Sequence, residues 1–157
     1  LAARLDDGEL ILIDGATGTE IERRGVPQLE NAWNGGGALS HPDVVREVHH
    51  DYISAGSQII ISNTFAASRH ALDDAGVAEH FDALNRRGVE LAVEARERSA
   101  NPDIVVAGGI SYWSWTGDKP GLNTLNQSIT EQAKIMKEAG ADLLMLEMMV
   151  DIESFSR

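Results

Sequence analysis

The sequence predicts an α/β fold built on a parallel sheet, and three observations support this fold class. Four short apolar runs are continuous rather than alternating, which is typical of strands buried on both faces. Longer segments of helical periodicity separate these runs. An Ala-Gly pair precedes the second and the fourth run, where glycine accepts the left-handed conformation that ends a helix. This alternation favours parallel strands joined by right-handed crossovers.

The elements follow in order along the chain. Strands are expected at residues 9–13, 58–62, 104–107 and 142–146, and helices at 41–55, 78–99 and 128–139. Ser40 is a suitable N-cap for the first helix, with Pro42 in its first turn. Residues 54–63 and 138–147 share one order of residue types. In each, the end of a helix is followed by Ala-Gly, then by an apolar run typical of a buried strand, and then by a polar residue. The match indicates two units of one strand-and-helix ladder, although chance similarity of two such loops is the alternative.

Small or polar residues follow each expected strand. Because the carboxyl ends of parallel strands lie at one edge of a sheet, we expect Asp14, Asn63 and Glu147 to share one mouth. The strands are roughly 40 to 50 residues apart, and eight such units would fill or exceed the about 250 residues of a closed barrel. The sequence therefore predicts a single domain over residues 1–157 that supplies strands 1–4, the N-terminal half, of a (β/α)8 TIM barrel.

Composition narrows the classes of function. With 25 acidic and 13 basic residues and a net charge of -12, the chain is not expected to bind nucleic acid or an anionic membrane surface. No apolar run approaches the about 18 residues of a spanning helix. Residues 1–10 lack the apolar core of a signal peptide, so a cytoplasmic location is expected. The absence of cysteine excludes disulfides, a thiol nucleophile and cysteine-bound zinc within these residues.

Four motifs in order resemble the homocysteine S-methyltransferase family. They are LIDGATGTEIERRG at 12–25, SNTFAASRHAL at 62–72, AGGIS at 107–111 and AGADLLMLEMM at 139–149. The resemblance covers nearly the whole chain. It implies methyl transfer from a sulfonium, ammonium or folate donor to the thiol of homocysteine, giving methionine. Homocysteine and a small-molecule methyl donor are then the expected partners, and a homo-oligomer is an open alternative to a monomer.

The resemblance also implies a cofactor that these residues do not hold. Enzymes of the family resemble complete barrels that bind zinc through three cysteines of the later strands, and none of those cysteines lies in this chain. Zinc is therefore expected in the complete protein only. The 157 residues on their own are expected to be inactive, and neither a catalytic residue nor a metal ligand is assigned among them.

The residues at the strand ends suit recognition of the amino-acid end of homocysteine. A carboxylate forms a charge-assisted hydrogen bond with an α-ammonium group, which is the role expected for Glu147, with Asp14 as a second acidic group. The substrate carboxylate needs donors, and backbone N–H groups in a turn can form a small anion-binding nest. The candidate substrate-binding residues are Asp14, Gly15, Ala16, Thr17, Asn63, Thr64 and Glu147. Asp14 could instead only cap its turn, Glu147 could be a surface charge, and Asn63 and Thr64 could only hold their loop.

Two other functions remain open. A different barrel enzyme of the lyase or aldolase type would use Glu147 and Asp14 as metal ligands or acid–base groups. A non-catalytic half-barrel would dimerise to cover its unpaired sheet edges.

Several further segments have two interpretations. The aromatic residues Tyr112, Trp113 and Trp115 either form a cage for a cationic donor or cover the barrel mouth. The five histidines show no metal-binding spacing and are expected to be solvated. Residues 34–37 are expected to form a flexible loop, and Asn123 and Thr124 are expected to lie in a loop.

Overall fold

The computed structural model describes residues 1–149 and contains a parallel three-stranded sheet. Its strands are β1 (Ile59–Ile61), β2 (Val105–Ile110) and β3 (Leu143–Leu146), in the order β1-β2-β3. Ile60 pairs with Val106 and Gly108 with Leu144, both in parallel register. Parallel strands of this register bring their carboxyl ends to one edge, which is the edge where the site is found.

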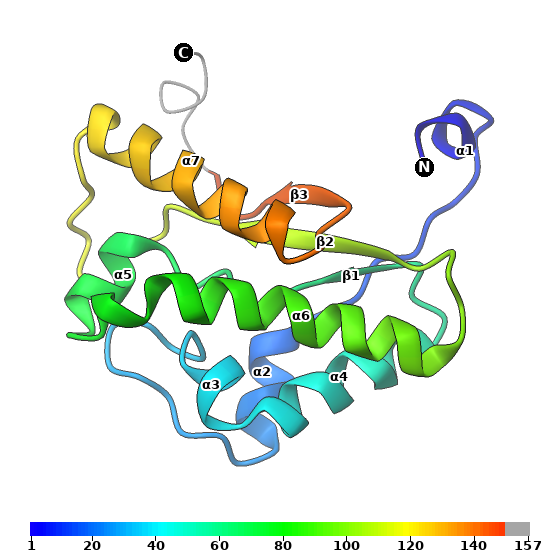
Figure 1. Ribbon diagram of the computed structural model, residues 1–157, viewed down its shortest axis with the longest axis horizontal. Coiled ribbons are helices and arrows are strands. Elements are labelled where there is room, and N and C mark those ends of the chain that lie inside the picture. Colours follow the sequence, from blue (N-terminus) through cyan, green and yellow to red (C-terminus); the bar gives the residue numbers. More distant parts are fainter. Residues whose placement is uncertain (150–157) are drawn as a thin grey trace.

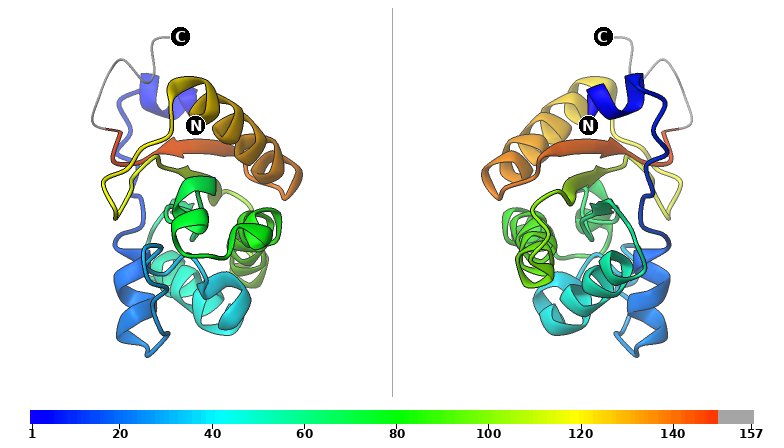
Figure 2. Two further views of the ribbon diagram at one scale, coloured as in Figure 1. Left: turned by 90° about the vertical axis from the view of Figure 1, so that its left-hand side faces the viewer. Right: turned by 90° about the vertical axis from the view of Figure 1, so that its right-hand side faces the viewer.

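Three long helices lie side by side against the sheet (Figure 1). They are α4 (Pro42–Ser54), α6 (Phe81–Ser99) and α7 (Leu122–Glu138). Figure 2 shows from both ends that α6 lies between α4 and α7. The shorter elements are α1 (Ala2–Asp6), α2 (Thr17–Arg23), α3 (Gly37–Ser40), α5 (Arg69–Asp74) and the 3-10 turn η1 (Ala78–His80). Figure 1 shows α1 apart from the sheet, at the end of an extended segment.

The main core fills the space between the sheet and its helices. Ile60 and Val106 are fully buried there against Val89 and Ala92 of α6 and Met136 of α7. Burying side chains of this size contributes roughly 1.5–3 kcal/mol each. This packing fixes the strands relative to the helices, and so fixes the loops that leave the carboxyl ends of the strands.

The expected strand at residues 9–13 does not form, and that prediction is wrong. Ile13 makes only an isolated parallel bridge with Ile59. Leu10 is 82% exposed, and Leu12 and Ile13 are about half exposed, so the run is not buried on two faces. The physical reason is that the run lies beside a β1 of only three residues and finds little to pack against in the described part of the chain. The parallel bridge nevertheless delivers the next residue, Asp14, to the carboxyl end of β1, where its N–H donates to the Ile59 carbonyl at 3.0 Å.

The other elements agree in type with differences at their ends. The helix expected at 128–139 begins six residues earlier, so Asn123 and Thr124 lie in its first turn and not in a loop. The N–H groups of a helix's first turn have no carbonyl partner within the helix. Polar side chains that bond to nearby backbone groups therefore do not disrupt the helix at these positions. Ser40 belongs to α3 and donates to the Gly36 carbonyl at 3.1 Å, while His41 occupies the N-cap of α4. The short helices α1, α2, α3 and α5 were not expected.

Residues 34–37 form a packed turn rather than a flexible loop. Asn34, Gly35 and Gly37 are buried. A Cβ at Gly35 would lie 2.7 Å from the Ala66 carbonyl oxygen, so this glycine permits a close approach of two backbones. Across residues 1–149, none of the helices combines the length and the apolar character needed to cross a bilayer.

Candidate functional site

A pocket of about 200 Å³ opens at the carboxyl ends of the strands, beside the first turn of α2. Its walls come from the segment after Asp14, the buried turn at 33–34, the end of β1 and the residue that follows β3. The lining residues are Gly15, Ala16, Thr17, Gly18, Trp33, Asn34, Ile61, Ser62, Asn63, Phe65, Ala66 and Glu147. Five of the seven predicted site residues are among them, and the other two, Asp14 and Thr64, are buried and each adjoins a lining residue in the sequence.

Asp14 is a buried carboxyl group held by the end of β1. Its Oδ2 accepts a hydrogen bond from the Ile61 N–H at 2.8 Å. Its Oδ1 is buried and has no hydrogen-bond partner among residues 1–149. Burial, opposed by the Ile61 hydrogen bond and reinforced by the charge of Glu147, raises the pKa of Asp14 to about 7. An unpartnered buried acceptor is costly, which favours a ligand that donates to it.

Glu147 follows β3 and enters the same pocket. Its N–H donates to the Ile110 carbonyl at 2.9 Å, which continues the β2–β3 ladder to the pocket edge. Burial raises the pKa of Glu147 to about 6. A Cβ on Gly109 would collide with the Glu147 carboxylate, so the glycine of β2 makes room for this side chain. Glu147 therefore lines the cavity, and Asp14 lies near enough for the Glu147 charge to act on its pKa, so the strand ends bring the two acidic groups together.

Asn63 and Thr64 hold the walls of the pocket together. The Asn63 Nδ2 donates to the Asn34 carbonyl at 3.0 Å, and the Asn34 Nδ2 donates to the Gly18 carbonyl at 2.8 Å. The Thr64 hydroxyl donates to the Gly109 carbonyl at 2.7 Å and is fully buried behind the wall. These bonds link the ends of β1 and β2 to the turn at 33–34 and to α2.

The expected nest of backbone donors is only partly available. The Thr17 N–H is already bonded to the Gly15 carbonyl at 2.8 Å, in a tight turn just before α2. Gly15 and Ala16 line the pocket, so their N–H groups are the remaining candidates for a substrate carboxylate.

Two aromatic residues of the pocket were missed by sequence reasoning. Trp33 and Phe65 both line it and meet edge to face, with ring centroids 6.4 Å apart. A Cβ on Gly18 would lie 2.5 Å from the Trp33 ring, so the absence of a side chain at Gly18 leaves space for the indole. The sequence did contain a signal for both rings. Trp33 directly precedes the Asn-Gly turn at 34–35, and Phe65 directly follows the polar residues at the end of a strand.

Of the two interpretations of Tyr112, Trp113 and Trp115, the contacts of Tyr112 and Trp115 do not support a cage. Tyr112 is buried, with the Lys119 ammonium 4.6 Å from its ring centroid. Trp115 instead meets Phe65 edge to face, with ring centroids 6.0 Å apart. The aromatic residues that line the pocket are therefore Trp33 and Phe65, and Trp115 contacts Phe65 without lining the pocket.

The histidines are not uniformly solvated, which corrects the expectation. His49 is fully buried and both ring nitrogens lack a partner within the described residues; burial lowers its pKa to about 4. His70 is half-buried, and its Nε2 lies 3.1 Å from the Tyr112 carbonyl oxygen and 3.0 Å from that of Trp113.

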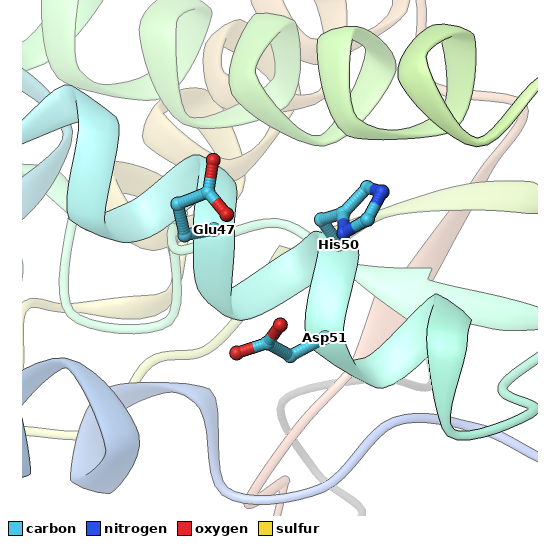
Figure 3. Close-up of side chains that lie close together, drawn as sticks. All are labelled: Glu47, His50 and Asp51. Atoms are coloured by element: carbon cyan, nitrogen blue, oxygen red, sulfur yellow. The ribbon is translucent and has the colours of Figure 1, made fainter.

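One group of potential metal ligands lies on α4 (Figure 3). Ligand atoms of Glu47, His50 and Asp51 fall within 4.8 Å of one another, although no metal spacing was expected. Both carboxylates are already paired with arginine, Asp51 with Arg24 at 2.6 Å and Glu47 with Arg98 at 2.9 Å. These ion pairs compete with a cation, and the group is not part of the pocket lining. The pocket itself offers carboxylate and amide oxygens, so the residues of this chain do not fit a zinc ion bound by three cysteines.

Together, the fold and the site define an α/β domain with a small, partly polar pocket at the carboxyl edge of a parallel sheet. The chain belongs to the homocysteine S-methyltransferase family, because the model of that family matches residues 11–156. This confirms the family that the four motifs indicated.

Individual relatives agree with this assignment. The chain is 32% identical to the homocysteine S-methyltransferase of Escherichia coli, covering 94% of this chain and 52% of that protein. It is 31% identical to a selenocysteine methyltransferase of Astragalus bisulcatus, covering 89% and 50%. It is 27% identical to betaine–homocysteine S-methyltransferase 1 of Sus scrofa, covering 96% and 54%.

Solved structures show the same likeness. The oxidized form of the homocysteine methyltransferase MmuM from E. coli superposes with a TM-score of 0.78 at 31% identity, over 92% of this chain and 55% of that one. Its metallated form gives a TM-score of 0.75 at 30% identity, over 91% and 55%. The chain thus spans about half the length of the relatives it matches.

Proposed function

We propose that this chain is the amino-acid-recognition half of a zinc-dependent homocysteine S-methyltransferase. In this proposal it forms one domain that supplies the N-terminal half of a (β/α)8 barrel, and the whole protein transfers a methyl group to homocysteine, giving methionine. The observation on which the proposal depends most is the pair of neighbouring carboxyl groups at the carboxyl edge, the buried Asp14 and the half-buried, pocket-lining Glu147.

The acidic pair suits an α-ammonium group. Asp14 Oδ1 is an unpartnered buried acceptor, and the Glu147 carboxylate lines the cavity. A primary ammonium donates up to three hydrogen bonds and brings a positive charge that favours the ionised form of both groups. Binding it would therefore satisfy Asp14 and lower both raised pKa values. We assign the carboxylate of the same amino acid to the N–H groups of Gly15 and Ala16, because both residues line the pocket.

The aromatic wall suits the second substrate. Trp33 and Phe65 line the pocket and meet edge to face. A sulfonium or methylated ammonium is attracted to an aromatic face by about 0.5–2 kcal/mol. We assign the methyl donor to this side, and the choice among sulfonium, ammonium and folate donors is left to the experiment.

Activation of the homocysteine thiol is assigned to residues outside this chain. One solved relative is a metallated form, and zinc remains our proposal for the metal. Because the chain has no cysteine, and the described pocket lacks a suitable ligand set, none of the steps proposed for this chain passes through the metal.

The test is a methyl-transfer assay with the full-length protein that contains these residues. Homocysteine would be supplied with S-methylmethionine, betaine or a methylated folate in turn, and methionine would be measured. We expect one donor class to support turnover. Absence of methionine with every donor in metal-replete protein would contradict the proposal and would favour a lyase-type barrel or a non-catalytic module.

A further inference from the structure

The loop that follows β2 is fastened to α5 at two points. His70 Nε2 lies 3.1 Å from the Tyr112 carbonyl oxygen and 3.0 Å from the Trp113 carbonyl oxygen. Because both loop partners are acceptors, Nε2 must hold the proton and donate it. One turn further along α5, the Asp74 Oδ2 accepts from the Thr116 hydroxyl at 3.0 Å. The two attachments bracket residues 112–116.

Between these two attachments the loop presents Trp115 to the pocket wall. The Trp115 ring meets Phe65 edge to face at 6.0 Å, and Phe65 meets Trp33 in the same way at 6.4 Å. Trp115 is 37% exposed and is not itself a lining residue, whereas Phe65 and Trp33 are. Phe65 is therefore in contact with a residue whose neighbours in the loop, at 112–113 and 116, are hydrogen-bonded to α5.

Neither fastening is explained by the packing of the core. His70 and Asp74 contribute no apolar side chain to the three buried clusters. The second ring nitrogen of His70, Nδ1, is buried without a partner in the described part of the chain. Burying Nδ1 without a hydrogen-bond partner costs free energy. The hydrogen bonds from Nε2 to the two loop carbonyls offset this cost, and they form only when the loop is in this position.

We propose that His70 and Asp74 are positioning residues for the methyl-donor side of the pocket. They hold the 111–121 loop so that Trp115 fixes Phe65, and Phe65 in turn completes the aromatic wall with Trp33. Homocysteine recognition at Asp14 and Glu147 does not depend on this loop. The inference rests on the proposed function for the identity of the two substrates, but the loop attachment itself does not.

The kinetic test uses the full-length protein with His70→Leu, His70→Gln and Thr116→Val. The controls are His80→Leu and Thr124→Val, which change an exposed histidine and an exposed threonine elsewhere. Loss of one such hydrogen bond should raise KM for the methyl donor about fivefold to tenfold, with KM for homocysteine changed less than about twofold. His70→Gln keeps an N–H donor of similar reach and should restore most of the donor affinity.

A second measurement does not need activity. The near-UV circular dichroism difference between the wild type and Trp115→Leu defines the signal of the Trp115–Phe65 contact. His70→Leu should remove most of this signal, and His80→Leu should not.

The outcomes separate the two proposals. An unchanged near-UV signal in His70→Leu, equal rises of both KM values, or His70→Gln as impaired as His70→Leu would each overturn the positioning role. A wild type without methyl transfer to homocysteine refutes the proposed function instead, and the near-UV comparison then still decides whether α5 positions Trp115.

Discussion

Replacing Glu147 with glutamine tests the acidic side of the pocket, because the change removes the charge and keeps the size. Burial raises the pKa of Glu147 to about 6, so the free protein holds this carboxyl about 90% ionised at pH 7 and about 10% ionised at pH 5. A hydrogen bond to a charged group contributes about 1.5–3 kcal/mol. We therefore expect Glu147→Gln to weaken homocysteine binding about 10- to 150-fold at pH 7.5.

The pH dependence gives the sharper form of this test. As pH falls through about 6, the wild type must release a proton from Glu147 before it binds the ammonium, so its affinity declines and its advantage over Glu147→Gln shrinks. Isothermal titration calorimetry on the full-length protein from pH 5 to 8 measures both affinities. Taking their ratio at each pH cancels the titration of homocysteine itself.

Glu97→Gln, at an exposed position of α6, is the matched control and should bind like the wild type. Equal affinities of Glu147→Gln and the wild type at pH 7.5 would remove Glu147 from the site. A ratio that stays equally large at pH 5 would show that the ionised carboxylate is not the cause of the difference.

Three further predictions concern Asp14, Gly18 and the isolated chain. Burial raises the pKa of Asp14 from 3.8 to about 7, so the folded state retains a proton that the unfolded chain releases, and this group lowers stability as pH rises from about 4 to 7. Asp14→Asn should therefore raise the free energy of unfolding more at pH 8 than at pH 4, by at most about 4 kcal/mol, and the melting temperature should follow; thermal melts showing the opposite trend would contradict the raised pKa of this carboxyl group. Gly18→Ala places a Cβ 2.5 Å from the Trp33 ring, and the displaced indole should raise KM for the methyl donor about tenfold or more, whereas Thr19→Ala, at an exposed neighbour, should not. The 157-residue chain with added zinc should produce no methionine in the transfer assay, because the thiol-activating ligands are assigned elsewhere; turnover by this chain would refute that division of roles.

The sequence predicted the parallel sheet and the meeting of Asp14 with Glu147 because both follow from local rules. Continuous apolar runs at 58–62 and 142–146 became β1 and β3, and each is followed by a polar residue at the same edge. The long helices were recognised by their apolar periodicity, and α4 begins and ends within one residue of the expected range. Such patterns can be recognised within a short window of neighbouring residues, without knowledge of the tertiary contacts.

The features that were missed depend on contacts between distant segments. The run at 9–13 has the composition of a strand, but strand formation also needs a partner ladder, and Ile13 finds only one bridge. Trp33 reaches the pocket because Gly18, fifteen residues earlier, has no side chain to block it. Burial of His49 likewise comes from the packing of α4 and not from any local pattern. No property of these residues taken singly indicates where they lie.

The central claim is that the ammonium group of homocysteine binds between Asp14 and Glu147, and a crystal structure of the full-length protein with homocysteine tests it most directly. We predict the substrate nitrogen within about 3 Å of a Glu147 oxygen and of Asp14 Oδ1, with its carboxylate toward Gly15 and Ala16. A substrate nitrogen that contacts neither carboxyl group, with the pocket beside α2 left without the amino acid, would contradict the account.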